Sequence, residues 1–428
     1  MRNSHTIKGL ALGSMAMLVA VGCAADQEGE GESEEEPIEL SFSWWGSDQR
    51  VANTEEVIEA FEDEHPNITI SPDYSDFRGY WDQLATRAAG GQTPDVVQMD
   101  LEYFREYAEL GALLELSEVE TSHIDESLLE QGFTEGGQYA IPTGFAAVAV
   151  IANDGVFDEA GVDLPDDTTW TWEDFSEIAA EIQASSDSVY GATTPFEPFA
   201  GVQAWLRQQG KELTTADGEL GIEAQDLVDY FAHIQELNEA DALPSASVIE
   251  EDRGAGADQS LIAQGEMGMI FGFSNLFPAL SENAGQELSL LRLPSPTGQA
   301  ADNGMWHRAS MFLSAGSQTE HPEEAQQFID FFINSEASGL ANLTDRGLPA
   351  NTEVREAVVE ELEGPEVEAA EFLNEIEDEL ADASPVPPLG FGTVSETMHR
   401  YQAEVLFGQM TPDEAGEAAF AEIESNLG

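Results

Sequence analysis

The sequence IELSFSWWGSDQRVANTEEVIEAFEDE, residues 38–64, has the pattern of a strand followed by a loop and a helix. Its first part, Ile38–Trp45, alternates and is rich in β-forming residues, which predicts a strand. Gly46-Ser47-Asp48 breaks that strand, and apolar residues then recur at helical spacing over Thr54–Glu64. A strand followed by a loop and a helix indicates the opening unit of an α/β domain.

Strand and helix patterns continue to alternate after this unit. A short strand at Ile68–Ile70 precedes a helix at Tyr80–Ala89, and a strand at Asp95–Met99 precedes a helix at Glu102–Glu109. Strands that alternate with helices at this spacing predict an α/β fold with mainly parallel sheets and helices on both faces.

Two lobes are expected, because 428 residues suffice for two or three domains of about 150 residues. The apolar segment Tyr139–Ile151 is interpreted as a crossing between them. Lobe 1 is assigned residues 38–145 with about 280–333, and lobe 2 about 146–279 with 334–428. Further core elements are expected as helices at 171–183, 225–237 and 323–333, as strands at 267–273 and 311–314, and as a helix capped by Thr411-Pro412-Asp413-Glu414.

The charge is strongly negative: 14 Lys plus Arg stand against 85 Asp plus Glu, a formal net charge of −71. This balance excludes a protein that binds nucleic acid electrostatically. Hydrophobic residues still make up 42% of the chain, enough for a packed core. The only lysines are Lys8 and Lys211. In molar salt the Debye length falls to about 3 Å, which screens the repulsion among the acidic residues. An acidic, lysine-poor chain is therefore expected to come from a halophilic source. The alternative is an acidic protein from an ordinary habitat.

The N-terminus has the pattern of an exported lipoprotein. Residues 1–22 carry Arg2 and Lys8, no acidic residue, and an apolar run too short to span a bilayer, which predicts a signal peptide. The run ends at Cys23, the single cysteine, in a sequence that resembles a bacterial lipobox. Residues 23–37 are acidic and lack bulky apolar side chains, so they are interpreted as a solvated tether behind a lipid-anchored Cys23.

Motifs for catalysis and metal binding are missing from the sequence. The seven histidines include no pair spaced three or four apart, which gives zinc ligation on a helix no support. The chain has no G-x-S-x-G elbow, no P-loop and no G-x-G-x-x-G. With 85 acidic residues, paired carboxylates occur by chance and do not indicate a glycosidase. No catalytic residue, metal or cofactor is therefore assigned.

Several segments together resemble the maltose-binding-protein-like group of extracellular solute-binding lipoproteins, which deliver sugars to ABC transporters. Their order and spacing along nearly the whole mature chain carry the resemblance. The segments are Trp44-Trp45-Gly46, Phe61-Glu62 with His65-Pro66-Asn67-Ile68, Ala88-Ala89-Gly90-Gly91-Gln92-Thr93-Pro94-Asp95-Val96-Val97, Ile141-Pro142-Thr143-Gly144, Phe157-Asp158-Glu159-Ala160-Gly161, Trp170-Thr171-Trp172-Glu173, Gly265-Glu266-Met267-Gly268-Met269, His321-Pro322-Glu323-Glu324-Ala325 with Phe328, and Arg346-Gly347-Leu348-Pro349.

The resemblance implies two α/β lobes joined by hinge strands, which close over a ligand in the cleft between them. It implies a receptor rather than an enzyme: a monomer, lipid-anchored at the extracellular face of the cytoplasmic membrane. Its partners would be a mono- or oligosaccharide and the transmembrane permease subunits with their cytoplasmic ATPase. In open α/β sheets such ligands bind at the carboxyl ends of strands.

The first loop contains the strongest candidate ligand contacts: Trp45, Ser47, Asp48 and Arg50 follow a strand end and, by the resemblance, lie at the cleft. Alternation is expected to bury Trp44 in the core and to leave Trp45 for the ligand. Asp100 directly follows another strand and is a further candidate. For Asp48 and Asp100 the alternative is a helix cap.

Five other residues complete the predicted site. Trp306 and Arg308 lie on one side of an extended segment and combine an aromatic face with a guanidinium group. Tyr74 and Trp205 are weaker candidates, because an aromatic residue in such a place often only covers the core. Asn275 is a candidate because it lies at the end of a buried strand, from which it is expected to reach the cleft.

Three alternatives in function stay open from the sequence. One is a receptor for another small solute, the second is a surface-anchored polysaccharide hydrolase, and the third is an adhesive surface protein. A hydrolase would bring two carboxylates about 5 to 10 Å apart in a cleft.

Overall fold

The opening unit folds as β1 (Ile38–Trp45) and α1 (Asp48–Glu64) in the computed structural model, which describes residues 37–134, 136–194, 198–215, 218–255 and 259–427. Helix α1 begins six residues before the predicted start, because Ser47 caps it by accepting a hydrogen bond from the backbone N–H of Arg50. The predicted signal peptide, Cys23 and the tether as far as Glu36 lie outside the described residues.

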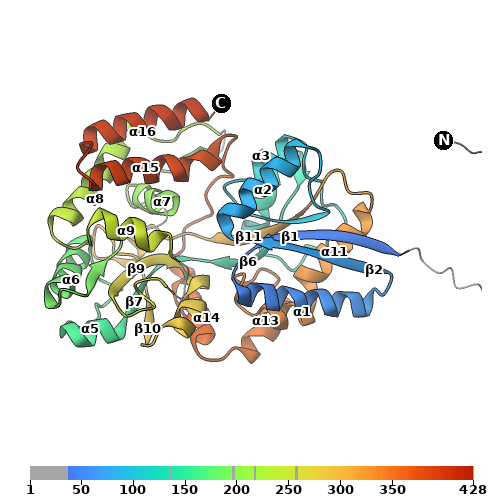
Figure 1. Cartoon of the computed structure of the whole chain (residues 1–428), viewed down its shortest axis with the longest axis horizontal. Helices are drawn as coiled ribbons and strands as arrows, with labels where there is room; N and C mark the ends of the chain where they lie inside the picture. Colours follow the sequence, from blue (N-terminus) through green and yellow to red (C-terminus); the bar gives the residue numbers. More distant parts are fainter. Residues whose placement is uncertain (1–36, 135, 195–197, 216–217, 256–258, 428) are drawn as a thin grey trace, which may run out of the picture. The chain divides into compact units, whose positions relative to one another are not determined.

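Lobe 1 is built around a six-stranded sheet in the order β12-β6-β11-β3-β1-β2 (Figure 1). Only β1–β2 and β1–β3 are parallel, whereas β11 pairs antiparallel with both β3 and β6, and β12 pairs antiparallel with β6. The expectation of a mainly parallel sheet is therefore wrong in detail, because strands from distant parts of the chain enter it in the opposite direction. The strands are β2 (Ile68–Ser75), β3 (Val96–Met99), β6 (Ile141–Ala146), β11 (Arg308–Ala315) and β12 (Leu348–Pro349).

Helices cover both faces of this sheet (Figure 1). On the α1 side, the ring of Phe42 in β1 packs against Phe328 and Phe332, with centroids 5.3 and 6.0 Å apart. Burying aromatic rings edge to face in this way stabilises the layer. The helices of the α1 side are α11 (Pro322–Asn334), α12 (Glu336–Asn342) and α13 (Thr352–Glu361); those of the other side are α2 (Phe77–Ala89) and α3 (Phe104–Glu109).

Lobe 2 is built around a four-stranded sheet in the order β10-β7-β9-β8. The predicted helices at 171–183 and 225–237 are present as α6 and α8, and Thr411 and Glu414 form the predicted capping box of α16. The strands are β7 (Val148–Asn153), β8 (Tyr190–Ala192), β9 (Met267–Phe273) and β10 (Leu288–Leu291). The helices are α5 (Asp154–Ala160), α6 (Trp172–Ser185), α7 (Pro198–Gln208), α8 (Ala224–Glu239), α9 (Ala246–Arg253), α10 (Phe277–Asn283), α14 (Pro365–Ile376), α15 (Val394–Leu406) and α16 (Pro412–Asn426).

The chain passes from one sheet to the other at Ala147, between β6 and β7 and inside the predicted crossing. Ser274 lies beside this point: its backbone N–H donates to the carbonyl of Ala147 at 2.8 Å, and its Oγ accepts from the Ala147 N–H at 3.2 Å. These bonds tie the end of β9 to the crossing.

The distribution of later segments differs from the predicted lobe boundaries. Strand β10 pairs with β7 in the four-stranded sheet, although residues from about 280 were assigned to lobe 1. Strand β12 pairs with β6, and α12 packs against α1, although residues from 334 were assigned to lobe 2. Lobe membership here depends on partners far away in the sequence, which local patterns do not reveal.

In the part of the chain that the structure describes, no helix has the length and apolar character needed to cross a membrane.

Candidate functional site

Polar and aromatic residues gather at one edge of the six-stranded sheet. The carboxyl ends of β1, β2 and β3 share this edge with the beginning of β11, because β11 runs antiparallel to β3. Neighbouring strands are about 4.8 Å apart, so loops from four strands lie within reach of one ligand. This is the edge at which open α/β sheets bind their ligands.

Asp100 and Arg308 meet at this edge, 208 positions apart in the sequence. Nη2 of Arg308 lies 3.4 Å from both carboxylate oxygens of Asp100, and Arg308 is only 5% exposed. Nε of Arg308 is buried without a hydrogen-bond partner among the described residues. Asp100 also accepts a hydrogen bond from the backbone N–H of Glu102 at 2.9 Å, in the turn before α3. It does not cap that helix, because α3 begins at Phe104 after the N-cap residue Tyr103.

Arg308 links this edge to lobe 2. Its guanidinium carbon lies 4.6 Å from the ring centroid of Phe273 at the end of β9, within the range of a cation–π contact. Phe273 in turn lines a cavity of about 210 Å³ at the carboxyl ends of β8 and β9. The guanidinium group of Arg308, which has an unused N–H donor, therefore lies against Phe273 at the side of this cavity. There it can donate a hydrogen bond to an oxygen of a ligand.

The cavity itself is lined by hydrogen-bonding side chains from three elements. The side-chain amide of Gln402 donates to Oγ1 of Thr194 at 3.1 Å, and Nε2 of His399 lies 2.9 Å from the carboxylate of Glu250. Burial raises the pKa of Tyr230, which donates to Gln402 at 3.4 Å and stays neutral. The other lining residues are Thr193, Ala200, Ile249, Asp252, Arg253, Ile270, Phe271, Gly272 and Leu276.

The predicted aromatic contacts of the first loop are arranged differently from expectation. Trp44 is fully buried as predicted, but Trp45 is also only 8% exposed, inside a cluster of rings on the α2 side. Tyr74 and Phe77 are the rings that remain open, at 50% and 48% exposure. Tyr74 packs against Trp44 at a tilt and Phe77 packs edge-on against Trp45, so the two tryptophans support the exposed rings.

The polar residues of the first loop have different environments. Asp48 is exposed at the first turn of α1, while Ser47 caps that helix. Arg50 is 8% exposed and is fully engaged by the chain: it pairs with Asp345 at 2.8 Å and also donates to the carbonyl of Trp45. We therefore place Arg50 in the framework that fixes the loop, rather than in contact with ligand.

Trp306, Trp205 and Asn275 lie in lobe 2 or at the crossings. Trp306 is 1% exposed and covered by the guanidinium of Arg207 at 5.1 Å, so it has no free face in this state. Trp205 is half-buried and stacks on His233 at 4.7 Å. Asn275 is half-buried directly after β9.

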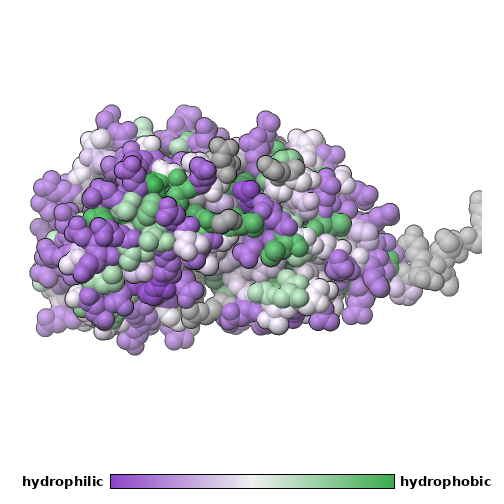
Figure 2. Space-filling model, turned by 90° about the horizontal axis from the view of Figure 1, so that it is seen from above, coloured by the Kyte–Doolittle hydropathy of each residue, from purple (hydrophilic) through white to green (hydrophobic). Residues whose placement is uncertain are grey.

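Lobe 1 and lobe 2 also touch beside the site. Oγ of Ser395 donates to Glu102 at 2.8 Å, and Arg105 donates to the carbonyl of Val386 at 3.2 Å. Viewed from the side on which α2, α3, α15 and α16 lie, hydrophobic residues gather in the middle of the face, between hydrophilic ends (Figure 2). Apolar surface of this kind is typical of a ligand-binding groove.

The residues that sequence reasoning missed are those of the lobe 2 cavity, above all Thr194, Glu250, His399 and Gln402. Glu250 lies in the run Glu250-Glu251-Asp252-Arg253, which has the composition of a solvated helix. His399 is one of seven histidines, none of which has a second histidine three or four positions away in the sequence. The one usable signal was Thr193-Thr194, which directly follows strand β8.

Among the described residues, no group of three or more His, Cys, Asp or Glu side chains is arranged to hold a metal ion. The site offers aromatic faces, hydroxyls, an amide, carboxylates and a guanidinium group, which together bind a polar ligand through hydrogen bonds and ring stacking. The fold and the site define the class: a two-lobe α/β binding protein with a ligand site between strand ends.

The family follows from comparison with known proteins. The chain matches the model of the bacterial extracellular solute-binding proteins over residues 45–338. This protein belongs to that family. A relative, an uncharacterized lipoprotein in the oleD 5′ region of Streptomyces antibioticus, is 26% identical over 361 residues, covering 80% of this chain and 76% of the relative.

Two solved structures show the same fold. A periplasmic oligogalacturonide-binding protein from Yersinia enterocolitica, in complex with saturated digalacturonic acid, superposes with a TM-score of 0.82 at 21% identity, covering 91% of this chain and 98% of that one. An ABC substrate-binding protein from Listeria monocytogenes, in complex with cycloalternan, gives a TM-score of 0.78 at 22% identity, with 91% and 99% coverage. At this identity the likeness concerns the fold alone.

Proposed function

We propose that this protein is the binding component of an ABC importer, capturing a mono- or oligosaccharide by closure of its lobes and delivering it to the permease and its ATPase. The observation that carries the proposal is the group of Asp100, Arg308 and Phe273 beside the lobe 2 cavity. Sugars present hydroxyls to planar polar groups and C–H faces to aromatic rings, and this group supplies both. Two relatives of the same fold, described above, are in complex with saccharides, which supports the choice.

Closure of the lobes is proposed to trap the ligand. Tyr74 and Phe77 would cover the sugar from lobe 1, while Thr194, His399 and Gln402 would bind hydroxyls from lobe 2. Hinge closure around a solute is an established motion for two-lobe folds. Once water is excluded, hydrogen bonds to charged groups contribute about 1.5 to 3 kcal/mol each.

The test is thermal melting of the protein in molar salt against a panel of mono- and oligosaccharides, with amino acids and metal ions as controls. High salt is chosen because a chain of net charge −71 is expected to come from a saline habitat. A ligand at 100 times its Kd adds about 2.7 kcal/mol of stability and raises Tm. A selective rise with one group of sugars supports the proposal; a rise only with a control solute overturns the assignment to carbohydrate.

We propose a binding role without turnover. The carboxylates of the lobe 2 cavity already have protein partners: Glu250 pairs with His399, and Asp252 accepts a hydrogen bond from the backbone N–H of Leu261 at 2.7 Å. A glycoside hydrolase needs one carboxylic acid and one carboxylate free to reach the sugar. Release of shorter sugars from the ligand that raises Tm would contradict this proposal.

The predicted anchor gives a separate expected outcome. Cys23→Ser removes the only thiol that a lipid can modify, so the protein should move from the membrane fraction to the soluble fraction. Immunoblotting of fractionated cells measures this, with the unchanged chain as control. Continued retention of Cys23→Ser in the membrane fraction would show that another segment anchors the protein.

A further inference from the structure

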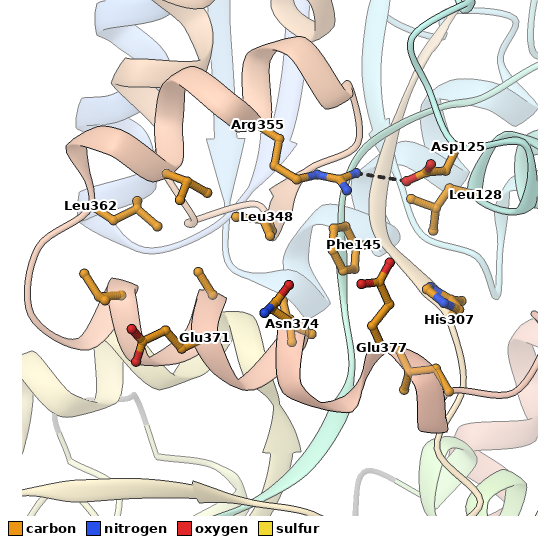
Figure 3. Close-up of a pocket in the computed structure, with 15 residues that line it drawn as sticks. Asp125, Leu128, Phe145, His307, Leu348, Arg355, Leu362, Glu371, Asn374 and Glu377 are labelled. Carbon is orange, nitrogen blue, oxygen red and sulfur yellow. Dashed lines mark hydrogen bonds and ion pairs between the residues drawn. The ribbon is translucent and has the colours of Figure 1, made fainter. Parts of the chain in front are cut away.

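A second, larger cavity lies away from the candidate sugar site (Figure 3). Its volume is about 550 Å³, which is within the usual range for small-molecule sites. Most of its wall is apolar and comes from four separate segments of the chain: Leu128, Phe145, Leu348, Val359, Leu362, Val367, Ala370, Leu373 and Leu380.

Helices from two packing groups form the two sides of this cavity. Helix α13 packs against α12 and β12 of the six-stranded sheet, whereas α14 packs against α10 and β10 of the four-stranded sheet. The cavity shares no lining residue with the lobe 2 cavity of the candidate sugar site. It is therefore an independent feature, and its occupant need not be a sugar.

Arg355 supplies the positive charge at one side. Its Nε donates to the carbonyl of Pro349 at 2.8 Å, and Nη2 donates to Asp125 at 3.0 Å and to the carbonyl of Ala350 at 3.2 Å. The guanidinium carbon lies 4.6 Å from the ring centroid of Phe145, which forms part of the wall. These contacts hold the group rigidly and use Nε and Nη2, so Nη1 is the nitrogen left to bind a ligand.

Carboxylates and an amide lie across the cavity on α14 and the short 3-10 helix that follows it. Figure 3 shows Glu377 pointing towards Phe145 and Arg355, with Asn374 beside it and Glu371 further along the helix. All three residues are exposed to solvent and line the cavity. The site therefore has the ion pair of Arg355 and Asp125 at one side, further carboxylates and an amide at the other, and apolar walls between and around them.

We propose that this cavity binds a free α-amino acid with an apolar side chain, such as leucine or phenylalanine. The ligand carboxylate binds Nη1 of Arg355, the ammonium group binds Glu377, and the side chain packs against Leu348, Val367 and Ala370. A zwitterion offers an oxygen to Nη1 of Arg355 and N–H donors to Glu377 at once, whereas an apolar carboxylate or an apolar amine offers only one of the two. Burial of the apolar side chain against these walls adds to the affinity.

Calorimetry on the purified full chain tests this with four probes: L-leucine, L-phenylalanine, 4-methylpentanoate, which lacks the ammonium group, and 3-methylbutylamine, which lacks the carboxylate. L-Leucine or L-phenylalanine should bind at least about tenfold more tightly than both truncated analogues, because each loses one charge-assisted contact. If neither amino acid binds better than its analogues, the proposal is overturned.

Variants locate the site. Glu377→Gln should weaken binding of the amino acid about tenfold. The matched control Glu375→Gln, in the last turn of α14 and outside the cavity, should not change it. Ala370→Trp fills the cavity and should abolish amino-acid binding. The sugar-dependent rise in Tm should persist in Ala370→Trp, which shows that the chain is folded. Equal loss in Glu377→Gln and Glu375→Gln, or undiminished binding in Ala370→Trp, would place the ligand elsewhere.

Discussion

The double variant Asp100→Asn/Arg308→Gln is expected to weaken sugar binding about a hundredfold while leaving the fold intact. A hydrogen bond from a buried guanidinium contributes up to about 3 kcal/mol, and a loss near that value corresponds to about a hundredfold in Kd. Arg308 is 5% exposed, has an unused Nε donor and lies against Phe273, so a ligand oxygen bound there is shielded from water. Calorimetry with the sugar that raises Tm measures the change.

The two positions are changed together for a physical reason. Arg308→Gln alone would leave the carboxylate of Asp100 buried and unpaired, which is strongly destabilising. The double variant replaces an ion pair by two neutral amides of similar size. Its Tm without sugar should therefore stay close to that of the unchanged protein.

A surface ion pair of the same lobe provides the matched control. Arg87 and Asp73 also form a salt bridge, but their side chains are 36% and 40% exposed. Asp73→Asn/Arg87→Gln removes the same charges from a pair that is open to solvent, so sugar affinity should stay within twofold, since exposed pairs contribute about 0 to 1 kcal/mol. Equal effects of the two double variants would mean that the loss of affinity does not depend on contact between Arg308 and the sugar.

Lowering the pH from 6.5 to about 4 is expected to reduce the free energy of unfolding by about 3 kcal/mol because of a single histidine, His233. Its ring lies between Trp205, stacked at 4.7 Å, and Trp172, edge-on at 4.7 Å. Its Nε2 is buried without a hydrogen-bond partner among the described residues. Burial disfavours the charged imidazolium and lowers the pKa of His233 from 6.5 to about 4.

The direction of the pH dependence follows from this shift. Between pH 6.5 and about 4 the unfolded chain binds a proton at His233 that the folded chain does not, so the free energy of unfolding falls as the pH falls. The contribution is fully present above pH 6.5. At 1.36 kcal/mol per pH unit, the interval of 2.5 corresponds to about 3 kcal/mol, and below pH 4 this residue causes no further loss.

Urea unfolding of the unchanged chain and of His233→Phe, measured from pH 7.5 to 4, isolates this effect. Many acidic residues titrate in the lower half of that range in both proteins, so only the difference between the two curves reports His233. The difference should grow in favour of His233→Phe as the pH falls. Parallel curves would mean that His233 is protonated in the folded chain and that the ring cluster opens to admit water.

The elements that the sequence predicted well are those in which a pattern is local. Helix α11 matches its expected bounds within one residue, and the Thr411 capping box forms as its spacing indicates. The burial of Trp44 follows from the two-residue period of a strand. Asp100 was proposed because it directly follows a strand, and Arg308 because it lies two residues from Trp306 on one side of an extended segment; the structure brings the two side chains together.

The residues whose environment differed from the prediction are those that are buried by partners far away in the sequence. Arg50 is buried because Asp345, 295 positions away, meets it at the end of β1. Trp306 loses its free face because Arg207 lies over its ring. The lobe 2 cavity was missed because its lining residues come from α7, α9, α15 and two strands, and none of these segments carries a recognisable motif.

The sequence by itself determined that the chain has an α/β fold of alternating strands and helices and enough apolar residues for a core despite its charge of −71, and it predicts an N-terminus of the exported lipoprotein type. The tertiary structure decided which strands share a sheet and in which direction, which candidate side chains gather at one sheet edge, and where a second cavity lies. The physical reason is that hydrophobic periodicity and capping act within a few residues. A site, by contrast, forms where β11 enters antiparallel beside β3 and brings together groups more than 200 positions apart.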